Sequence, residues 1–202
     1  MKILVIGAKG TIGSKVVDAL CASHDVIKAG KGSGDVAIDL TNPDSMREAL
    51  ASVGKLDAIV CAAGDVAFNS FANLSREEWD VGINSRLMGQ VNLTQIGAEY
   101  LSDGGSITLT SGIIADHPIA YGVSAATLNG AIQHFVNAVA NELPRGIRIN
   151  VVSPTVVTES LATYGDYFPG FHAIDAKDLA KSYVRSVLGV ETGKTFKAFA
   201  GN

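Results

Sequence analysis

The chain is poor in the residues that several classes of protein require. Cysteine occurs twice in 202 residues, aromatic residues make up 6%, and 16 basic residues stand against 20 acidic ones. Spaced cysteine motifs, basic blocks and apolar runs near the ~18 residues of a membrane span are all missing. These absences argue against a cysteine metal or redox site, nucleic-acid binding and membrane insertion.

Other deficits point the same way. Residues 1–8 lack the long apolar region of a signal peptide, so we expect a soluble cytoplasmic protein. The histidines show no metal-ligand spacing, so no metal is expected. Cys21 and Cys61 are interpreted as small buried apolar residues.

Glycine, in contrast, is abundant, with 22 residues. At roughly 150 residues per domain, the length predicts one domain covering residues 1–202. Strand and helix patterns alternate along it, which is typical of an α/β, Rossmann-like, doubly wound parallel sheet with helices on both faces. We expect about seven strands in the order 3-2-1-4-5-6-7. The predicted strands are 2–6, 25–28, 35–38, 56–61, 106–110, 147–152 and 195–199, and the predicted helices are 11–22, 43–53, 75–100 with a break near Gly82, 121–143 and 174–188.

A glycine-rich turn follows the first predicted strand and opens the first helix. It runs from Gly7 through Lys9, Gly10, Thr11 and Ile12 to Gly13. Backbone N–H groups at such a helix start bind a pyrophosphate, which indicates a dinucleotide site. The glycine spacing departs from the usual dinucleotide fingerprint, and the alternative is a turn without a ligand.

The residues after the second strand favour NADP over NAD. Ala29, Gly30 and Lys31 leave no carboxylate there to bind a ribose 2′-hydroxyl. Lys31, Lys9 and Ser33 could instead hold a 2′-phosphate. The alternative for both lysines is an ordinary solvated side chain. Asp39 either accepts a bond from the adenine amino group or serves as a carboxylate in the first turn of the next helix.

Several motifs resemble those of the short-chain dehydrogenase/reductase family over nearly the whole chain. They are the glycine turn, Cys61-Ala62-Ala63-Gly64 in place of Asn-Asn-Ala-Gly, residues 148–154 (RINVVSP) with Thr155 replacing a glycine, and Thr192-Gly193 before the last strand. The resemblance implies a pocket at the carboxyl ends of the strands. The glycine turn, Lys31, Ser33 and Asp39 are already predicted to bind the cofactor. The resemblance adds eight further cofactor-binding residues, namely Leu40, Ala62, Ala63, Gly64, Pro154, Thr155, Val156 and Val157.

The same resemblance implies a catalytic set that this chain matches only in part. Family members commonly use Asn, Ser, Tyr and Lys. Tyr121 matches the tyrosine of Tyr-x-x-x-Lys, but Ala125 stands at the lysine position. Ser111 is the candidate for the serine that holds the substrate oxygen, although one alignment puts Gly112 there. The alternative for Ser111 is a structural hydroxyl at the end of the strand. The alternative for Tyr121 is an aromatic residue that packs at the start of the helix.

The asparagine position is open between two residues. Asn84 looks similar, yet the neighbouring Gly89, Thr94 and Gln95 fit the family pattern only if Arg86 occupies that position. We therefore hypothesise that Arg86 restores the missing cation, because a tyrosine with a reference pKa of about 10 needs a nearby positive charge to work near neutrality. The alternative is a structural pairing of Arg86 with a carboxylate such as Glu142 across a subunit contact.

The functional prediction is an NADPH-dependent oxidoreductase acting on a small carbonyl or alcohol, with Tyr121, Ser111 and Arg86 in the catalytic set. The alternative is a catalytically silent NADP-binding module for redox sensing or interaction. Residues 155–174 could form a substrate lid, or simply a packed loop. Small residues on the helix from Tyr121 suggest a homodimer or homotetramer, and the same residues could instead let that helix lie close to the sheet.

Overall fold

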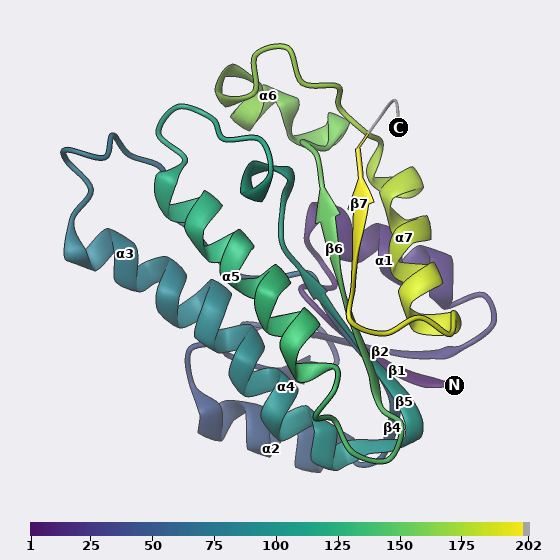
Figure 1. Cartoon of the computed structure of the whole chain (residues 1–202). Helices are drawn as coiled ribbons and strands as arrows, with labels where there is room; N and C mark the ends of the chain where they lie inside the picture. Colours follow the sequence, from purple (N-terminus) through teal and green to yellow (C-terminus); the bar gives the residue numbers. More distant parts are fainter. Residues whose placement is uncertain (200–202) are drawn as a thin grey trace.

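Seven parallel strands form one sheet in the order β3-β2-β1-β4-β5-β6-β7 in the computed structural model, which describes residues 1–199. This confirms the predicted order. The strands are β1 (Lys2–Ile6), β2 (Asp25–Gly30), β3 (Val36–Ala37), β4 (Leu56–Cys61), β5 (Leu101–Thr110), β6 (Arg148–Pro154) and β7 (Lys194–Ala198). Because all strands are parallel, their carboxyl ends lie at one edge, the edge nearest α6 (Leu161–Tyr164) in Figure 1.

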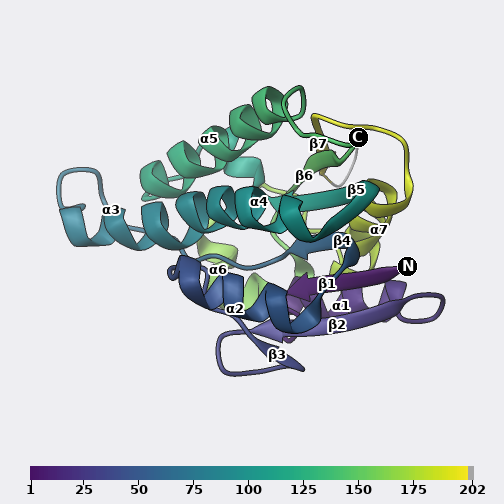
Figure 2. The same cartoon turned by 90° about the horizontal axis from the view of Figure 1, so that it is seen from below.

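Helices cover both faces of the sheet (Figures 1 and 2). One apolar core packs α2 (Pro43–Val53), α4 (Gly89–Tyr100) and α5 (Val123–Val139) against one face, and a second packs α1 (Thr11–Leu20) and α7 (Ala176–Leu188) against the other. Residues 3–6 of β1 are all buried, as expected for a strand covered on both faces. The buried faces therefore fix the layer order.

Local signals set several helix starts where the sequence predicts them. The Asn42 side chain accepts bonds from the backbone N–H groups of Asp44 and Ser45 and so caps α2, with Pro43 in its first turn. Ser75 and Glu78 form a reciprocal capping box at the start of α3 (Arg76–Gly82).

The helix predicted over 75–100 changes form where a break is expected. After α3, residues Ile83–Met88 form a π-helix, and α4 then continues to Tyr100. A π-helical turn widens the helix locally and is common at functional sites. Arg86 lies within this turn.

Three sequence predictions need correction. Strand β5 begins at Leu101, five residues before the predicted start at Ser106. Leu56 pairs with Leu101 and Ala58 pairs with Ser106, so residues 102–105 form a bulge between the two pairs. The helix predicted over 121–143 covers only Val123–Val139. Cys21 is exposed, whereas Cys61 is buried as predicted. In residues 1–199 no helix combines the length and the apolar character needed to cross a membrane.

Candidate active site

The glycine turn brings the start of α1 against the ends of β1 and β4. Gly7 has φ of +80°, and a Cβ there would lie 2.6 Å from the Ala62 carbonyl oxygen. A Cβ on Gly13 would lie 2.0 Å from the Gly7 carbonyl oxygen. Gly10 N donates to the same oxygen at 2.9 Å. The turn therefore closes only because side chains are missing at Gly7 and Gly13.

The first turn of α1 has no side-chain cap. Gly10 is the N-cap residue and no side chain accepts a hydrogen bond from this turn. Thr11 is exposed and Ile12 half-buried. An uncapped helix start with its positive dipole end is suited to an anion such as a diphosphate. The turn thus fits the group that the sequence predicts there.

A small cavity of about 160 Å³ lies beside this turn, at the ends of β1 and β2 and near the start of α2. It is lined by residues that include Gly7, Gly30, Lys31, Ile38, Asp39, Leu40, Ala63 and Gly64. Six of these, namely all but Gly30 and Ile38, are predicted cofactor residues. The structure therefore brings six of the predicted cofactor residues together around one cavity.

Lys31 and Asp39 form an ion pair at this cavity. Lys31 Nζ lies 2.9 Å from Asp39 Oδ2. The bonds from Lys31 and from the Thr41 hydroxyl and backbone N–H lower the pKa of Asp39 to about 2. Lys9 is exposed on the glycine turn, and Ser33 lies in the short connection between β2 and β3. Sequence reasoning treats Lys31 and Asp39 separately and misses that they pair.

A second cavity of about 330 Å³ lies where β4, β5 and β6 end. It is lined by Ile12, Gly64, Asp65, Val66, Phe68, Arg86, Gly112, Ile113, Ile114, Ala125, Asn129, Pro154, Thr155, Val156, Val157, Ser160, Tyr164 and Phe168. We call it the Arg86 cavity. It contains the predicted cofactor residues Ile12, Gly64 and 154–157, and its position at the carboxyl edge is where such sheets bind ligands.

Arg86 is held in this cavity by neutral groups. Its Nε and Nη2 both donate to Asn129 Oδ1 at 3.2 Å, Nη2 donates to the Ser111 carbonyl at 2.8 Å, and Nη1 donates to the Gly64 carbonyl at 3.0 Å. Burial lowers the pKa of the guanidinium. Glu142, the alternative partner across a subunit contact, lines a groove between α4 and α5 of the same chain, and its pairing with Arg86 of another copy stays a prediction.

The buried side chain of Gln90 forms hydrogen bonds to the backbone of Arg86 and of Thr110. Gln90 Nε2 donates to the carbonyls of Arg86 and Thr110 at 3.0 Å each, and Gln90 Oε1 accepts from Thr110 N at 2.8 Å. Gln90 has no exposed surface. The amide thereby ties the π-helical turn to the end of β5, because each of these buried groups needs a partner.

The structure does not bring Tyr121 and the Ser111 hydroxyl into the Arg86 cavity. Tyr121 has φ of +61°, is 57% exposed and lines a neighbouring cavity of about 650 Å³ with Asn69, Ile119 and Tyr167. The Ser111 Oγ is turned into the protein and accepts a bond from Gln133 Nε2 at 3.1 Å. Of the predicted catalytic set, only the Arg86 side chain lines the Arg86 cavity.

The segment predicted as a lid lies over this region. Val157 and Ile174 form a β-bridge at its base, and short helices occupy the residues between them. The ring of Phe68 lies 6.3 Å from that of Tyr164 and 5.4 Å from that of Tyr167. The aromatic contacts hold the segment against the wall of the Arg86 cavity.

Comparisons with known proteins identify the family. A family model described as enoyl-(acyl carrier protein) reductase matches residues 5–193. The protein lin1944 from Listeria innocua has a crystal structure that matches with a TM-score of 0.97 and 46% identity, covering 98% of this chain and 100% of that one. The chain belongs to the short-chain dehydrogenase/reductase family of oxidoreductases.

More distant relatives carry enzyme names. An uncharacterized oxidoreductase of Methylorubrum extorquens is 31% identical over 152 residues, which are 74% of this chain and 60% of that protein. L-xylulose reductase of Homo sapiens is 28% identical over 185 residues, 82% of this chain and 76% of the relative. The chain thus spans three fifths of the first relative's length and about three quarters of the second's.

The positions of α5 that line the Arg86 cavity begin about one helical turn after Tyr121. Ala125 and Asn129 both line the Arg86 cavity and are four residues apart, the spacing of the family's Tyr-x-x-x-Lys. Gly112, the second alternative for the serine position, lines it as well. Sequence reasoning misses Asn129. The signal that could have found it is the same four-residue spacing, counted from Ala125 instead of Tyr121.

Proposed function

We propose that this protein is an NADP(H)-dependent oxidoreductase that interconverts a small carbonyl compound and its alcohol. The observation that carries the proposal is the uncapped start of α1 at a turn that Gly7 and Gly13 close, beside a cavity at the carboxyl edge of the sheet. A diphosphate at that helix start would extend a nicotinamide toward the Arg86 cavity.

The residues that would hold the cofactor follow from this placement. Backbone groups of residues 7–13 bind the diphosphate, Asp39 and Leu40 lie at the adenosine end, and residues 62–64 and 154–157 lie at the nicotinamide end. Lys31, with Lys9 and Ser33, binds a 2′-phosphate once Lys31 leaves Asp39. Two relatives support the preference for NADP by their names, carbonyl reductase [NADPH] 2 of Sus scrofa and the NADP-dependent mannitol dehydrogenase of Hypocrea jecorina.

Bound NADPH supplies the hydride in this reaction. The chain supplies a fixed positive charge, because Arg86 stays protonated at neutral pH and stabilises negative charge that develops on the substrate oxygen. Tyr121 as proton donor stays a prediction. Its ring lies in the neighbouring cavity, which shares the Phe68 side chain with the Arg86 cavity.

Titration with NADPH and NADH tests the cofactor proposal. We expect NADPH to bind more tightly, and Lys31→Ala to weaken NADPH binding about tenfold while NADH binding stays the same, since only NADPH carries the extra phosphate. Lys55→Ala, at an exposed lysine directly before β4, is the control. Tighter binding of NADH to the wild-type chain would contradict the assignment.

A carbonyl panel with NADPH tests the chemistry. Wild-type chain and Tyr121→Phe are compared across pH, and the exposed position of Tyr121 leads us to expect less than a threefold loss of turnover. A loss of a hundredfold or more, with a changed pH profile, would restore Tyr121 as the proton donor.

A silent NADP-binding module is the second candidate. The observation that favours it is the lining of the Arg86 cavity. Gly112, Ala125 and Asn129 stand there in place of the family's Ser, Tyr and Lys residue types, and Tyr121 does not line this cavity within residues 1–199. Tight NADPH binding without oxidation by any carbonyl compound of the panel would select this candidate.

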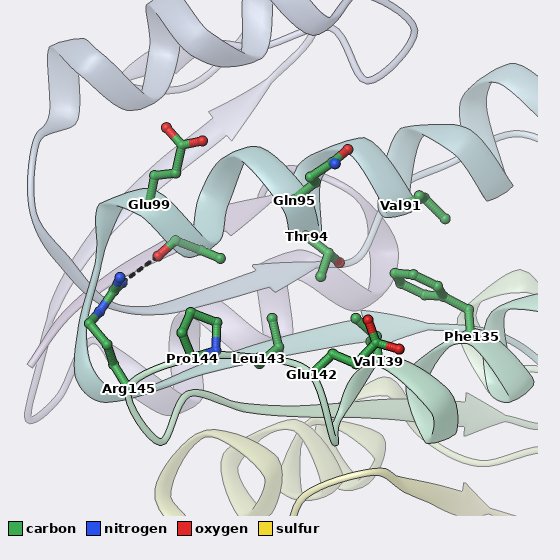
Figure 3. A pocket seen from close by; sticks show the side chains of 11 residues that line it. Val91, Thr94, Gln95, Glu99, Phe135, Val139, Glu142, Leu143, Pro144 and Arg145 are labelled. Atoms are coloured by element: carbon green, nitrogen blue, oxygen red, sulfur yellow. Dashed lines mark hydrogen bonds between the residues drawn. The ribbon is translucent and has the colours of Figure 1, made fainter.

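A homodimer or homotetramer is also proposed. Figure 3 shows a groove between α4 and α5 in which Phe135 lies near Val91 and Leu143 lies further along, beside Pro144. Sedimentation or light scattering tests this, and Phe135→Asp should give monomers because a charge would be buried in the contact. The cytoplasmic location stays a prediction.

A further inference from the structure

The Arg86 cavity contains a charged hydrogen-bond donor without a protein partner. The bonds of Arg86 to Asn129, Ser111 and Gly64 use the Nε proton, both Nη2 protons and one Nη1 proton. Each Nη of a guanidinium carries a pair of N–H groups. One N–H of Arg86 Nη1 is therefore left without an acceptor among residues 1–199, in a side chain that lines the cavity.

The amide of Asn129 provides a second such donor. Its Oδ1 accepts both bonds from Arg86. These bonds fix the orientation of the amide, because the reversed orientation would place the N–H groups of Asn129 against those of Arg86. Nδ2 has no acceptor in the part of the chain that the structure describes. Asn129 is only 3% exposed and lines the cavity. Nδ2 is not among the fully buried side-chain atoms without a partner, so it keeps accessible surface and can donate to a ligand oxygen in the cavity.

Gly112 leaves that amide uncovered. Its φ of −172° is extended backbone that any residue adopts, so the backbone does not require glycine. A Cβ at this position would lie 3.1 Å from Asn129 Nδ2. The missing side chain therefore keeps the amide open to the cavity.

The charge at these donors is positive and has no acidic partner. The guanidinium bonds go to carbonyl and amide oxygens, and no ion pair of the described residues includes Arg86. Asp65 is the carboxylate that lines the cavity, and it is exposed. A half-buried cation with neutral partners attracts an anion more strongly than a solvated one does.

We propose that the Arg86 cavity binds a small 2-oxo acid with an apolar side chain. One oxygen of its carboxylate or oxo group accepts from Arg86 Nη1, the neighbouring oxygen accepts from Asn129 Nδ2, and the carboxylate balances the charge. The apolar walls at Phe68, Ile113 and Phe168 suit the side chain. The binding assignment stands on the cavity alone.

The reaction of this acid rests on the proposed oxidoreductase function. With NADPH bound, a hydride would form the new C–H bond at the oxo carbon, the C=O π electrons would pass to oxygen, and that oxygen would take a proton from solvent. The products are the 2-hydroxy acid and NADP⁺. Arg86 and Asn129 bind and polarise the oxygens in this scheme.

Binding is tested without turnover by calorimetric titration of phenylglyoxylate into the chain loaded with NADP⁺, which carries no hydride. The neutral methyl ester of the acid is the comparison. We expect the acid to bind at least tenfold more tightly than the ester. Arg86→Met should remove this preference, and Gly112→Ala should reduce it by covering Asn129 Nδ2. Arg47→Met, an exposed arginine on α2, should leave it unchanged.

Equal binding of acid and ester by the wild-type chain would overturn the proposal, as would an unchanged preference in both cavity variants. Circular dichroism checks the fold of each variant. If Arg86→Met does not fold, Gly112→Ala decides, because it removes no charge and no hydrogen-bonding group. If NADP⁺ does not bind, the same titrations are made with the chain alone.

The two proposals fail in different ways. Binding of phenylglyoxylate with the expected preference, without oxidation of NADPH by it or by any compound of the carbonyl panel, would remove the oxidoreductase function and leave the anion site. Reduction of neutral carbonyl compounds, with no binding of phenylglyoxylate, would leave the oxidoreductase function and remove the 2-oxo acid assignment.

Discussion

The glycine turn and the Arg86 cavity lie at the same edge of the sheet but depend on different kinds of information. The turn is made by backbone atoms of residues 7–13, close together in the chain. The cavity is made by side chains from segments that extend from Ile12 to Phe168. The difference teaches that a site built from local backbone can be recognised by spacing, whereas a site built from distant side chains cannot.

Gly13→Ala should have the largest effect and would break the turn. The added methyl group would lie 2.0 Å from the Gly7 carbonyl, so helix and strand must move apart. We expect a loss of about 3 kcal/mol in the free energy of unfolding and a fall of roughly 9 °C in Tm, together with loss of dinucleotide binding. Calorimetry and NADPH titration measure both.

Gly10→Ala is the matched control for Gly13→Ala. Its Cβ would approach the Gly7 carbonyl only to 3.3 Å, and its φ of −74° suits any residue. Similar losses in the two variants would show that glycine content, and not the close contact at Gly13, determines the turn.

Gln90→Leu tests the cavity side of the comparison. The substitution leaves the buried carbonyl of Arg86 and the buried N–H and carbonyl of Thr110 without their side-chain partner. We expect a loss of about 2 kcal/mol in the free energy of unfolding by urea. Asn137→Leu, at an exposed position of α5 that does not line the groove between α4 and α5, should change it by about 0.5 kcal/mol or less. Equal effects would mean that the buried bonds of Gln90 contribute little.

These predictions depend on parts of the molecule that the sequence anticipates to different degrees. The strand order, the starts of α2 and α3 and the break near Gly82 follow from local patterns, and the structure confirms them. The placement of Tyr121 could not be foreseen. The turn at Tyr121, with its positive φ, precedes the helix, so α5 presents Ala125 and Asn129 to the cavity instead.

Gly130→Ala probes α5 away from the cavity and should have a smaller, stabilising effect. A Cβ there meets no atom within 4 Å. Alanine loses less backbone entropy than glycine in a helix, so we expect a gain of about 0.8 kcal/mol and a Tm roughly 2 °C higher. Destabilisation would instead indicate that this side of α5 packs closely on another copy of the chain.

Lys31→Ala should have the smallest effect on stability. The folded-state pKa of Asp39 is lowered from 3.8 to about 2, so its contribution is complete above pH 4 and is lost as the pH falls toward 2. Lys31 is 78% exposed, which limits the loss at pH 7 to about 0.5 kcal/mol. Urea unfolding at pH 7, 4 and 3 should show the variant and wild type converging. A constant difference would rule out this ion pair as its source.

The sequence by itself determined the doubly wound sheet and the glycine turn, because strand and helix periods and a positive φ at glycine act over a few neighbouring residues. Only the tertiary structure decided which side chains meet at the Arg86 cavity. Arg86 lies in a π-helical turn, Asn129 lies a turn further along α5 than the motif suggests, and Gly64 and Ser111 provide the carbonyls between them. Their meeting depends on helix phase and on the packing of helices against the sheet, which neighbouring residues do not encode.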